Sequence, residues 1–338
     1  MSRRRGLGAA ALVLALVAGA CGGGSKKAAP KTTTTMPLVT TTTEPPPPAV
    51  LTNLPLAERA NLKRPALVVK VENAPEARPQ AGIDKADVVY EEVVEGGVVR
   101  FLCVFQSQDA ASVGPVRSVR PVDPDIVSPL KGYFAYSGGA PQFVKLIKRA
   151  PVTQASWDDL PKAYTERRDR PQPHHLFTST AKIYGSGKKA DGPPPQLFTY
   201  GTATGAAVTH ATVVMGSPTK ADWDWDAAAS RWKRTTNGTA HVMEDGTQLA
   251  FANVVVQYVR YSNTTSRDPS GSLVPTATVV GSGTAMILSG ATMVQAKWTK
   301  RTASDVTAYT DAAGLPINVA PGPTWVMLAP LGAQTTTR

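Results

Sequence analysis

The feature that most limits what this chain can fold into is a long segment near its start that consists mainly of Gly, Lys, Thr and Pro. It runs from Gly22 to about Pro48 and includes the runs Thr32–Thr35 and Pro45–Pro48. Such a composition cannot bury a hydrophobic core, and the proline run favours extended polyproline II structure. We therefore expect residues 21–53 to form a disordered stalk that carries the folded part.

The residues before the stalk have the pattern of a signal peptide. The arginines Arg3–Arg5 precede an apolar run that ends at Ala20 and is too short to remain as a membrane-spanning helix. Small residues then precede a cysteine, as in the lipobox of bacterial lipoproteins. We expect residues 1–20 to be removed and Cys21 to be lipidated, which places the chain on the extracytoplasmic face of the cell membrane. An ordinary signal-peptidase site is the alternative, because Ala18 stands where a lipobox usually carries a larger aliphatic residue.

Two regions with different patterns of apolar residues follow the stalk, and together they predict an α+β fold with two domains. Residues 54–200 mix β-branched runs with helical patterns and indicate a mixed α/β domain, which ends in a glycine- and proline-rich connection. Residues 201–331 alternate like strands and indicate a β-rich domain, as a sheet, a sandwich or a partly open barrel. A last threonine run suggests that residues 332–338 form a frayed tail.

The periodicity also predicts individual elements. In the first domain we expect strands at 66–71, 87–94, 98–106 and 133–136 and a helix at 141–148. Between the second and third of these strands, Glu95-Gly96-Gly97 predicts a hairpin turn, because glycine readily adopts positive φ. In the second domain the expected strands are 210–215, 231–236, 254–261, 276–280, 283–288, 293–300 and 307–310.

The charge of the folded part is moderately positive. The chain has a formal net charge of +11, of which the signal peptide contributes three and the stalk a net two, so that +6 remains. Outside the cytoplasm, a basic surface raises the local concentration of anionic lipid head groups and anionic wall polymers. Export excludes nucleic acid as a partner, and a charge that serves only solubility is the alternative.

Short motifs in both halves resemble those of the YerB-like bacterial lipoproteins. In the first half they are Asn73 with Ala77–Gly82, Ala86–Glu91, and Gly114–Ser118 with Arg120. In the second half they are Trp225, Arg234, Gln257, Trp298, Lys300 and Trp325. The resemblance implies a two-domain, membrane-anchored extracytoplasmic protein whose biochemical activity is undefined.

Serine motifs suggest two enzymatic interpretations. Ser128–Lys131 and Ser179–Lys182 have the S-x-x-K spacing of penicillin-binding enzymes, but the companion Lys-Thr-Gly is absent from the sequence. Ser137 and Gly138 follow an expected strand, as in a nucleophile elbow, and His174 is the candidate base. A cell-envelope serine hydrolase that uses Ser137 and His174 is therefore the alternative function.

The remaining chemistry-bearing residues favour no metal or cofactor. The four histidines lack H-E-x-x-H spacing and the two cysteines are far apart, so we expect neither a metal nor a cofactor. Cys103 lies in an apolar run and is expected in the core. The tryptophans are also expected in the core, with stacking on a sugar ring as the alternative. They include Trp223, Trp232, Trp298 and Trp325.

Arginines beside turns form the preferred candidate site. A planar guanidinium suits a carboxylate or a phosphate, and the backbone N–H groups of two neighbouring glycines can add contacts to an anion. We expect these residues to form an anion pocket in a non-enzymatic binding or regulatory lipoprotein. The candidate partners are membrane lipid through Cys21, and peptidoglycan, an anionic wall polymer or a wall-synthesis protein. The candidate ligand-binding residues are Arg78, Arg100, Arg117, Arg120, Gly138, Gly139 and His174.

Internal ion pairing is the competing interpretation of the same arginines. Buried arginines are normally paired, and several carboxylates lie nearby in the sequence. The candidate internal partners are Asp87, Glu91, Glu92 and Glu95.

Overall fold

The computed structural model describes residues 47–56 and 59–338. The predicted signal peptide, Cys21 and most of the predicted stalk lie outside the described residues. The prediction that the stalk extends to residue 53 was wrong, because Leu51 is fully buried and Thr52 is 2% exposed. Gly322 N donates to Thr52 O at 2.7 Å, and Tyr200 Oη donates to Leu51 O. The apolar side chains that follow the proline run therefore already belong to the folded part.

One large mixed sheet of twelve strands crosses the folded part. Its strand order is β19-β18-β17-β15-β21-β2-β3-β1-β4-β5, while β16 pairs with β15 and β9 pairs with β18. The first-half strands are β1 (Leu67–Glu72), β2 (Val88–Val93), β3 (Val99–Phe105), β4 (Tyr133–Ala135) and β5 (Thr153–Gln154). The others are β9 (Ala206–Ala207), β15 (Asn253–Arg267), β16 (Leu273–Thr278), β17 (Gly281–Ser289), β18 (Thr292–Lys300), β19 (Ala308–Thr310) and β21 (Thr324–Pro330).

The two halves of the sequence share this sheet. The late strand β21 lies between β15 and β2 and pairs in parallel with both of them. The central strands are buried on both faces, as is typical of a sheet covered on two sides, and all six residues of β1 and all seven of β3 are buried. The first and second halves are therefore held together by backbone hydrogen bonds as well as by side-chain packing.

A second sheet has six strands and covers one face of the first. All its pairings are antiparallel, in the order β13-β12-β11-β10-β22, with β14 paired to β12. The strands are β10 (His210–Val214), β11 (Lys220–Asp226), β12 (Arg231–Thr236), β13 (Thr239–Ala240), β14 (Ala250–Phe251) and β22 (Thr335–Thr337). The prediction of a frayed tail at 332–338 was wrong, because β22 pairs with β10 and Arg338 N donates to His210 O at 3.0 Å. Threonine is β-branched and suits such an edge strand.

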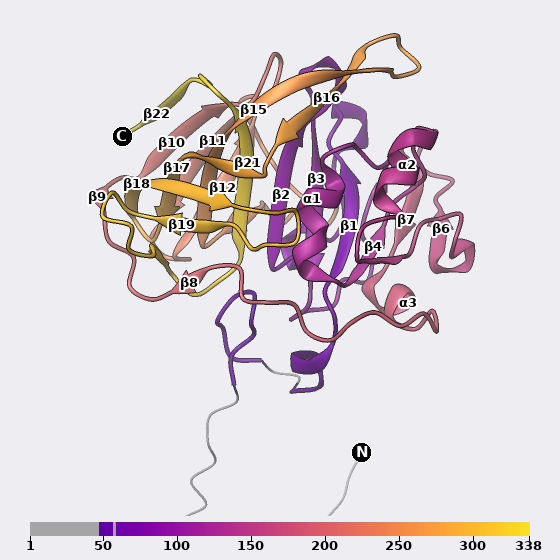
Figure 1. The fold of residues 1–338 in the computed structure, drawn as a ribbon, viewed down its shortest axis with the longest axis horizontal. Helices are drawn as coiled ribbons and strands as arrows, with labels where there is room; N and C mark the ends of the chain where they lie inside the picture. Colours follow the sequence, from indigo (N-terminus) through magenta and orange to yellow (C-terminus); the bar gives the residue numbers. More distant parts are fainter. Residues whose placement is uncertain (1–46, 57–58) are drawn as a thin grey trace, which may run out of the picture. The chain divides into compact units, whose positions relative to one another are not determined.

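Short helices and small strand pairs complete the fold (Figure 1). The helices α1 (Asp123–Val127) and α2 (Pro141–Ile147) contribute apolar side chains to the other face of the large sheet, opposite the six-stranded sheet. Helix α3 (Thr180–Tyr184) begins after Ser179, whose Oγ accepts a hydrogen bond from Lys182 N at 3.2 Å. The small pairs are β6 (Tyr164–Glu166) with β7 (Leu176–Thr178), and β8 (Thr199–Tyr200) with β20 (Asn318–Val319). Single 3-10 turns lie at Arg59–Lys63, Pro75–Ala77, Ile83–Lys85, Glu95–Gly97, Ser128–Leu130 and Pro161–Ala163.

The predicted α+β class and most predicted elements are confirmed. The turn Glu95–Gly97 joins β2 to β3 with positive φ at both glycines, 68° at Gly96 and 73° at Gly97. The tryptophans Trp223, Trp232 and Trp325 are fully buried, Trp298 is 3% exposed, and Cys103 is fully buried, which raises the pKa of its thiol. The strand ranges expected from the sequence included neither β11 nor β21, although Trp325 was expected in a strand. Strand β11 (KADWDWD) does alternate polar and apolar residues, but its three aspartates are uncommon in strands, and β21 is a continuous apolar run that ends in proline.

Candidate functional site

The candidate site begins with a row of charged side chains across three neighbouring strands. The register of β1 with β3 places Glu72 opposite Arg100, and the register of β2 with β3 places Glu92 opposite the same arginine. Because side chains two residues apart lie on one face of a strand, Lys70 shares this face with Glu72. The face is the one against which α1 packs. Four charges thus lie on an otherwise apolar sheet surface, and each needs a partner there.

Buried Lys70 holds the inner end of this row. Its Nζ donates to Asp123 Oδ1 at 2.6 Å and also to the carboxylate of Glu92, and Lys70 and Asp123 are fully buried. Burial raises the pKa of Glu92 to about 7, although the positive charge of Lys70 acts in the opposite direction. Asp123 also accepts a hydrogen bond from Arg120 N at 2.7 Å. This carboxylate therefore fixes the start of α1 and the loop before it.

The loop between β3 and α1 brings two of the predicted arginines to the row. Arg120 Nη2 donates to Glu95 Oε2 at 2.8 Å, and its Nε lies 2.7 Å from Glu95 Oε1. Arg117 Nε lies 3.1 Å from Glu72 Oε1. His174 Nδ1 lies 2.8 Å from the other oxygen of Glu72. Arg117 and Arg120 are thus both paired with carboxylates of the protein itself. Glu95 was among the expected partners, whereas Glu72 was not.

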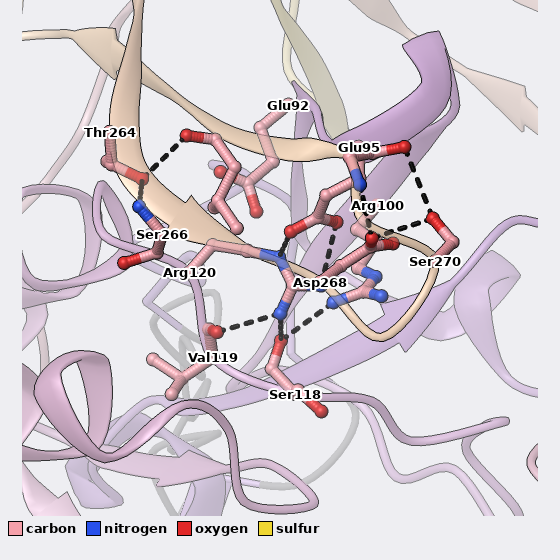
Figure 2. Close-up of polar contacts among 12 residues, drawn as sticks. Glu92, Glu95, Arg100, Ser118, Val119, Arg120, Thr264, Ser266, Asp268 and Ser270 are labelled. Atoms are coloured by element: carbon pink, nitrogen blue, oxygen red, sulfur yellow. Dashed lines mark hydrogen bonds and ion pairs between the residues drawn. The ribbon is translucent and has the colours of Figure 1, made fainter.

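Arg100 differs from these two neighbours. Its Nη1 donates to Ser118 O at 3.2 Å, and the described residues provide it with no ion-pair partner. Arg100 is 8% exposed, and its pKa is lowered to about 10 by burial and then by the charges of Arg120 and Arg117. Figure 2 shows Arg100 and Arg120 both directed toward the carbonyl of Ser118. We call Arg100, Arg117 and Arg120 the arginine cluster.

The long strand β15 carries a further charge to this cluster. Beyond Arg260, β15 pairs with β16 as a two-stranded arm that extends past the large sheet, and 268–272 form its tip (Figure 1). Figure 2 shows Asp268 of the tip beside Arg100 and Arg120. Hydrogen bonds from Ser270 are the main cause of the lowered pKa of Asp268, to which the charge of Arg120 also contributes. The second half of the sequence therefore supplies part of the site.

Arg78 does not join the arginine cluster. Its Nη2 donates to Asn73 O at 3.3 Å, and its pKa is lowered by burial and by the charge of Arg234. Arg234 lies on the opposite face of the sheet, where it forms a bidentate ion pair with Glu91 at 2.7 and 2.9 Å. The prediction that four arginines converge was therefore wrong for Arg78, because its loop continues toward the six-stranded sheet.

The two glycines lie beside the loop that carries the cluster. Gly138 O accepts from Val119 N at 3.0 Å, and Ser137 N donates to Arg117 O at 3.0 Å. A Cβ at Gly139 would lie 2.6 Å from Val119 Cγ1, so only glycine permits this approach. A ligand contact from Gly138 or Gly139 stays a prediction.

The geometry of a serine hydrolase does not form around Ser137. Among the described residues, Ser137 Oγ has no hydrogen bond to a histidine, and His174 Nδ1 instead contacts Glu72. Of the two S-x-x-K serines, Ser179 caps α3, and Ser128 Oγ donates to Pro124 O at 2.5 Å. The hydroxyl groups of Ser128 and Ser179 therefore form structural hydrogen bonds, whereas a catalytic serine needs a hydrogen bond to a base.

Outside the arginine cluster, the described residues contain no candidate metal site but do line an apolar cavity. No group of three or more His, Cys, Asp or Glu side chains in residues 47–56 and 59–338 is placed to hold a metal ion. A mainly apolar cavity of about 260 Å³ lies away from the arginines, and its lining includes Leu197, Phe198, Ile287, Tyr309 and Ile317. Sequence reasoning missed Lys70, Glu72 and Asp268. The charged residues of Leu67–Glu72 (LVVKVE) were the signal for the first two.

Comparison with known proteins places most of the folded part in one family. Models described as the N-terminal and C-terminal domains of "Protein of unknown function (DUF3048)" match residues 51–192 and 211–326. A Bacillus subtilis (strain 168) protein named "Putative lipoprotein YerB" is 26% identical over 293 residues, which cover 83% of this chain and 86% of that protein. The crystal structure of YerB protein from Bacillus subtilis has the same fold, with a TM-score of 0.74 at 24% identity over 86% of this chain and 99% of that one.

That relative is named as a lipoprotein, and no helix within the described residues has the length and apolar character needed to span a bilayer. The family models divide the sequence into an N-terminal domain of mixed sheet with few helices and a C-terminal domain of mainly antiparallel strands. The chain therefore belongs to the two-domain DUF3048 family of proteins of unknown function.

Proposed function

We propose that this protein is a lipid-anchored binding protein of the cell envelope and that the arginine cluster binds an anionic group of its ligand. Cys21 carries the lipid anchor on the extracytoplasmic side. The ligand belongs to peptidoglycan, to an anionic wall polymer or to a wall-synthesis protein. Ligand binding, rather than covalent chemistry, is the activity in this proposal, because Ser137 and His174 are not brought into contact.

The observation that carries this proposal is the state of Arg100. A buried guanidinium is costly unless it is paired, and the charges of Arg120 and Arg117 add to that cost, which the nearby carboxylates of Glu95 and Glu72 offset only in part. A carboxylate or a phosphate beside Arg100 would supply the opposite charge and accept two hydrogen bonds from the planar fork. The other two arginines already have carboxylate partners, so Arg100 is the member of the cluster with capacity for a ligand.

The test compares two arginine-to-lysine variants of the full lipidated chain in detergent micelles. Binding of acetate, inorganic phosphate and soluble peptidoglycan fragments is measured by ligand-observed NMR. Arg100→Lys keeps the charge but removes the fork, and we expect binding to weaken roughly tenfold, since a charge-assisted hydrogen bond contributes about 1.5–3 kcal/mol. Arg78→Lys is the matched control, because Arg78 lies outside the cluster, and it should leave binding unchanged.

Two outcomes contradict the proposal. The first is the absence of saturable binding of any of these ligands to the wild-type chain. The second is an equal loss of affinity in Arg100→Lys and Arg78→Lys. Thermal unfolding of each variant shows whether a loss of binding reflects loss of the fold.

A further inference from the structure

Most charges around the arginine cluster have an opposite partner. Glu72 is paired with Arg117, Glu95 with Arg120, and Lys70 with both Glu92 and Asp123. In the part of the chain that the structure describes, Arg100 and Asp268 are the two charges of this site with no ion pair. We call Arg100 and Asp268 the open pair. One is a cation and the other an anion, and they come from opposite halves of the sequence.

The position of Asp268 is set by the tip of the arm. Its Oδ1 accepts from Ser272 N at 2.9 Å and from Ser270 Oγ at 2.6 Å, which closes the turn between β15 and β16. Ser266 Oγ accepts from Gln142 Nε2 at 2.7 Å and so connects the arm to α2. Figure 2 shows that this arrangement leaves the carboxylate of Asp268 facing the side of the site where Arg100 lies.

The site as a whole carries no excess of positive charge. Apart from Arg267, which donates to Gly271 O at 2.6 Å on the tip, its four cations are outnumbered by five carboxylates, and one of these, Glu92, has its pKa raised to about 7 by burial. The formal charge near neutral pH is therefore between zero and −1. A dianionic phosphate or a polyanion would meet Asp268 without compensation, whereas a ligand with no net charge would not. The cations are Lys70, Arg100, Arg117 and Arg120, and the carboxylates are Glu72, Glu92, Glu95, Asp123 and Asp268.

We propose that the site selects a zwitterion of the α-amino-acid type, whose carboxylate binds Arg100 and whose protonated amine binds Asp268. This inference rests on the proposed function and names the ligand class of the same site. The carboxylate and the amine of an α-amino acid are separated by a single carbon, so one small group can neutralise both members of the open pair. Free amino acids share this chemistry with cell-wall peptides that contain a diamino dicarboxylic acid residue, whose side chain ends in a free amine and a free carboxylate on one carbon.

Turn formation is the competing explanation for Asp268. An aspartate at the tip of a hairpin commonly accepts hydrogen bonds from the backbone two or more residues on. Asp268→Asn separates the two roles, because the asparagine side-chain oxygen can accept the same hydrogen bonds but carries no charge. A loss of amine recognition in this variant therefore reports the charge, not the shape of the turn.

The experiment uses ligand pairs that differ only in the amine. Alanine is compared with propionate, and a wall peptide that ends in a free amino-acid group is compared with the same peptide after acetylation of that amine. Affinities for the full lipidated chain in detergent are measured by NMR titration. We expect wild type to prefer each amine-bearing ligand and Asp268→Asn to reduce that preference roughly three- to fivefold, as for a partly exposed ion pair. Arg100→Lys should weaken both members of each pair.

Each result decides a different point. If propionate and alanine bind equally through Arg100, the zwitterion is excluded while the proposed function stands. If the preference for the amine persists in Asp268→Asn, Asp268 is not its cause and the inference fails. If none of these ligands nor phosphate binds, the proposed function fails as well. Preference for the peptide pair alone identifies the wall peptide as the source, and preference for alanine over propionate alone identifies free amino acids.

Discussion

Buried arginines on the two faces of the central sheet differ in whether they have a carboxylate partner. Glu91 and Glu92 are adjacent in β2, so their side chains point to opposite faces. On one face, Glu91 and Arg234 form a fully buried bidentate pair, and Trp325 Nε1 adds a hydrogen bond to Glu91 at 2.7 Å. On the other face, the row around Glu92 contains Arg100, which forms no ion pair with a carboxylate of the described residues, although the charges of Glu95 and Glu72 still act on it.

This difference separates an internal structural network from a surface that can take a ligand. The guanidinium of Arg234 lies 4.6 Å from the ring centre of Trp325, and its Nε donates to Thr236 Oγ1 at 3.2 Å. The N–H groups of the Arg234 guanidinium are thus bound to buried side chains of the protein itself, which stay in place as long as the protein is folded. We call Glu91, Arg234, Thr236 and Trp325 the closed network. Among the described residues, the guanidinium of Arg100 instead donates to a loop carbonyl, Ser118 O at 3.2 Å, and we expect this contact to be displaced at smaller cost.

The largest expected effect concerns the closed network. Arg234→Met removes the cation but leaves Glu91 buried, and breaking a buried ion pair in this way costs about 3–5 kcal/mol. We expect the free energy of unfolding, measured by urea denaturation, to fall by that amount. The double variant Glu91→Gln, Arg234→Met should recover part of the loss, because no buried charge remains. A loss below about 1 kcal/mol in the single variant would contradict the structural role of the network.

The next effect is a pH dependence that originates on the face of the arginine cluster. The folded-state pKa of Glu92, about 7, lies above its ordinary value of 4.5, so the folded state holds this proton more tightly than the unfolded state. Its contribution to stability is complete below about pH 4.5 and is lost as the pH rises through about 7. We expect a decline of about 1–3 kcal/mol over that window, measured by denaturation at stepped pH. Glu92→Gln should remove it, and an unchanged slope in that variant would refute the assignment.

A histidine on the opposite face should give a pH dependence of opposite sign. His241 is buried between Thr236 Oγ1, at 3.0 Å, and Gln80 Oε1, at 2.9 Å. Burial, followed by the charges of Arg234 and Arg78, lowers its pKa well below 6.5. Below pH 6.5, His241 is protonated in the unfolded state but stays neutral in the folded state. The free energy of unfolding therefore falls as the pH drops, by roughly 1 kcal/mol per pH unit.

His241→Gln keeps hydrogen-bonding groups at this position without the titration, and the acid decline should flatten in that variant. The same stepped-pH denaturation measures it. If Glu92→Gln flattened the acid limb instead, the assignment of the two limbs to the two faces would be wrong.

Part of the site could be predicted from local sequence. The turn Glu95–Gly97 sets the register of β2 with β3 by its own chemistry, and that register places Glu92 opposite Arg100. The strand Leu67–Glu72 shows two charges within an apolar run, which indicates buried partners. Predictions that depend on a turn or on the alternation of one strand were therefore reliable.

The rest depends on contacts that no local pattern encodes. Arg234 meets Glu91 across 143 positions, because β21 lies between the strands of the two halves. Asp268 reaches the arginine cluster because β15 continues beyond the large sheet as an arm. In the sequence Arg78 looked equivalent to Arg100, because each lies beside turn-forming residues: Arg78 precedes Pro79, and Arg100 follows the turn Glu95–Gly97. Only the packing of the second half against the first separates them.

The smallest expected effect tests the open side of the comparison directly. In Arg100→Gln the hydrogen bond to Ser118 O can be kept, and the repulsion from Arg117 and Arg120 is relieved. We expect the free energy of unfolding to change by about 1 kcal/mol or less, measured under the urea conditions used for Arg234→Met, while binding of carboxylates is lost. A penalty as large as that of Arg234→Met would mean that Arg100 is part of the internal packing. The two faces would then be equivalent, and the arginine cluster would have no free cation to offer a ligand.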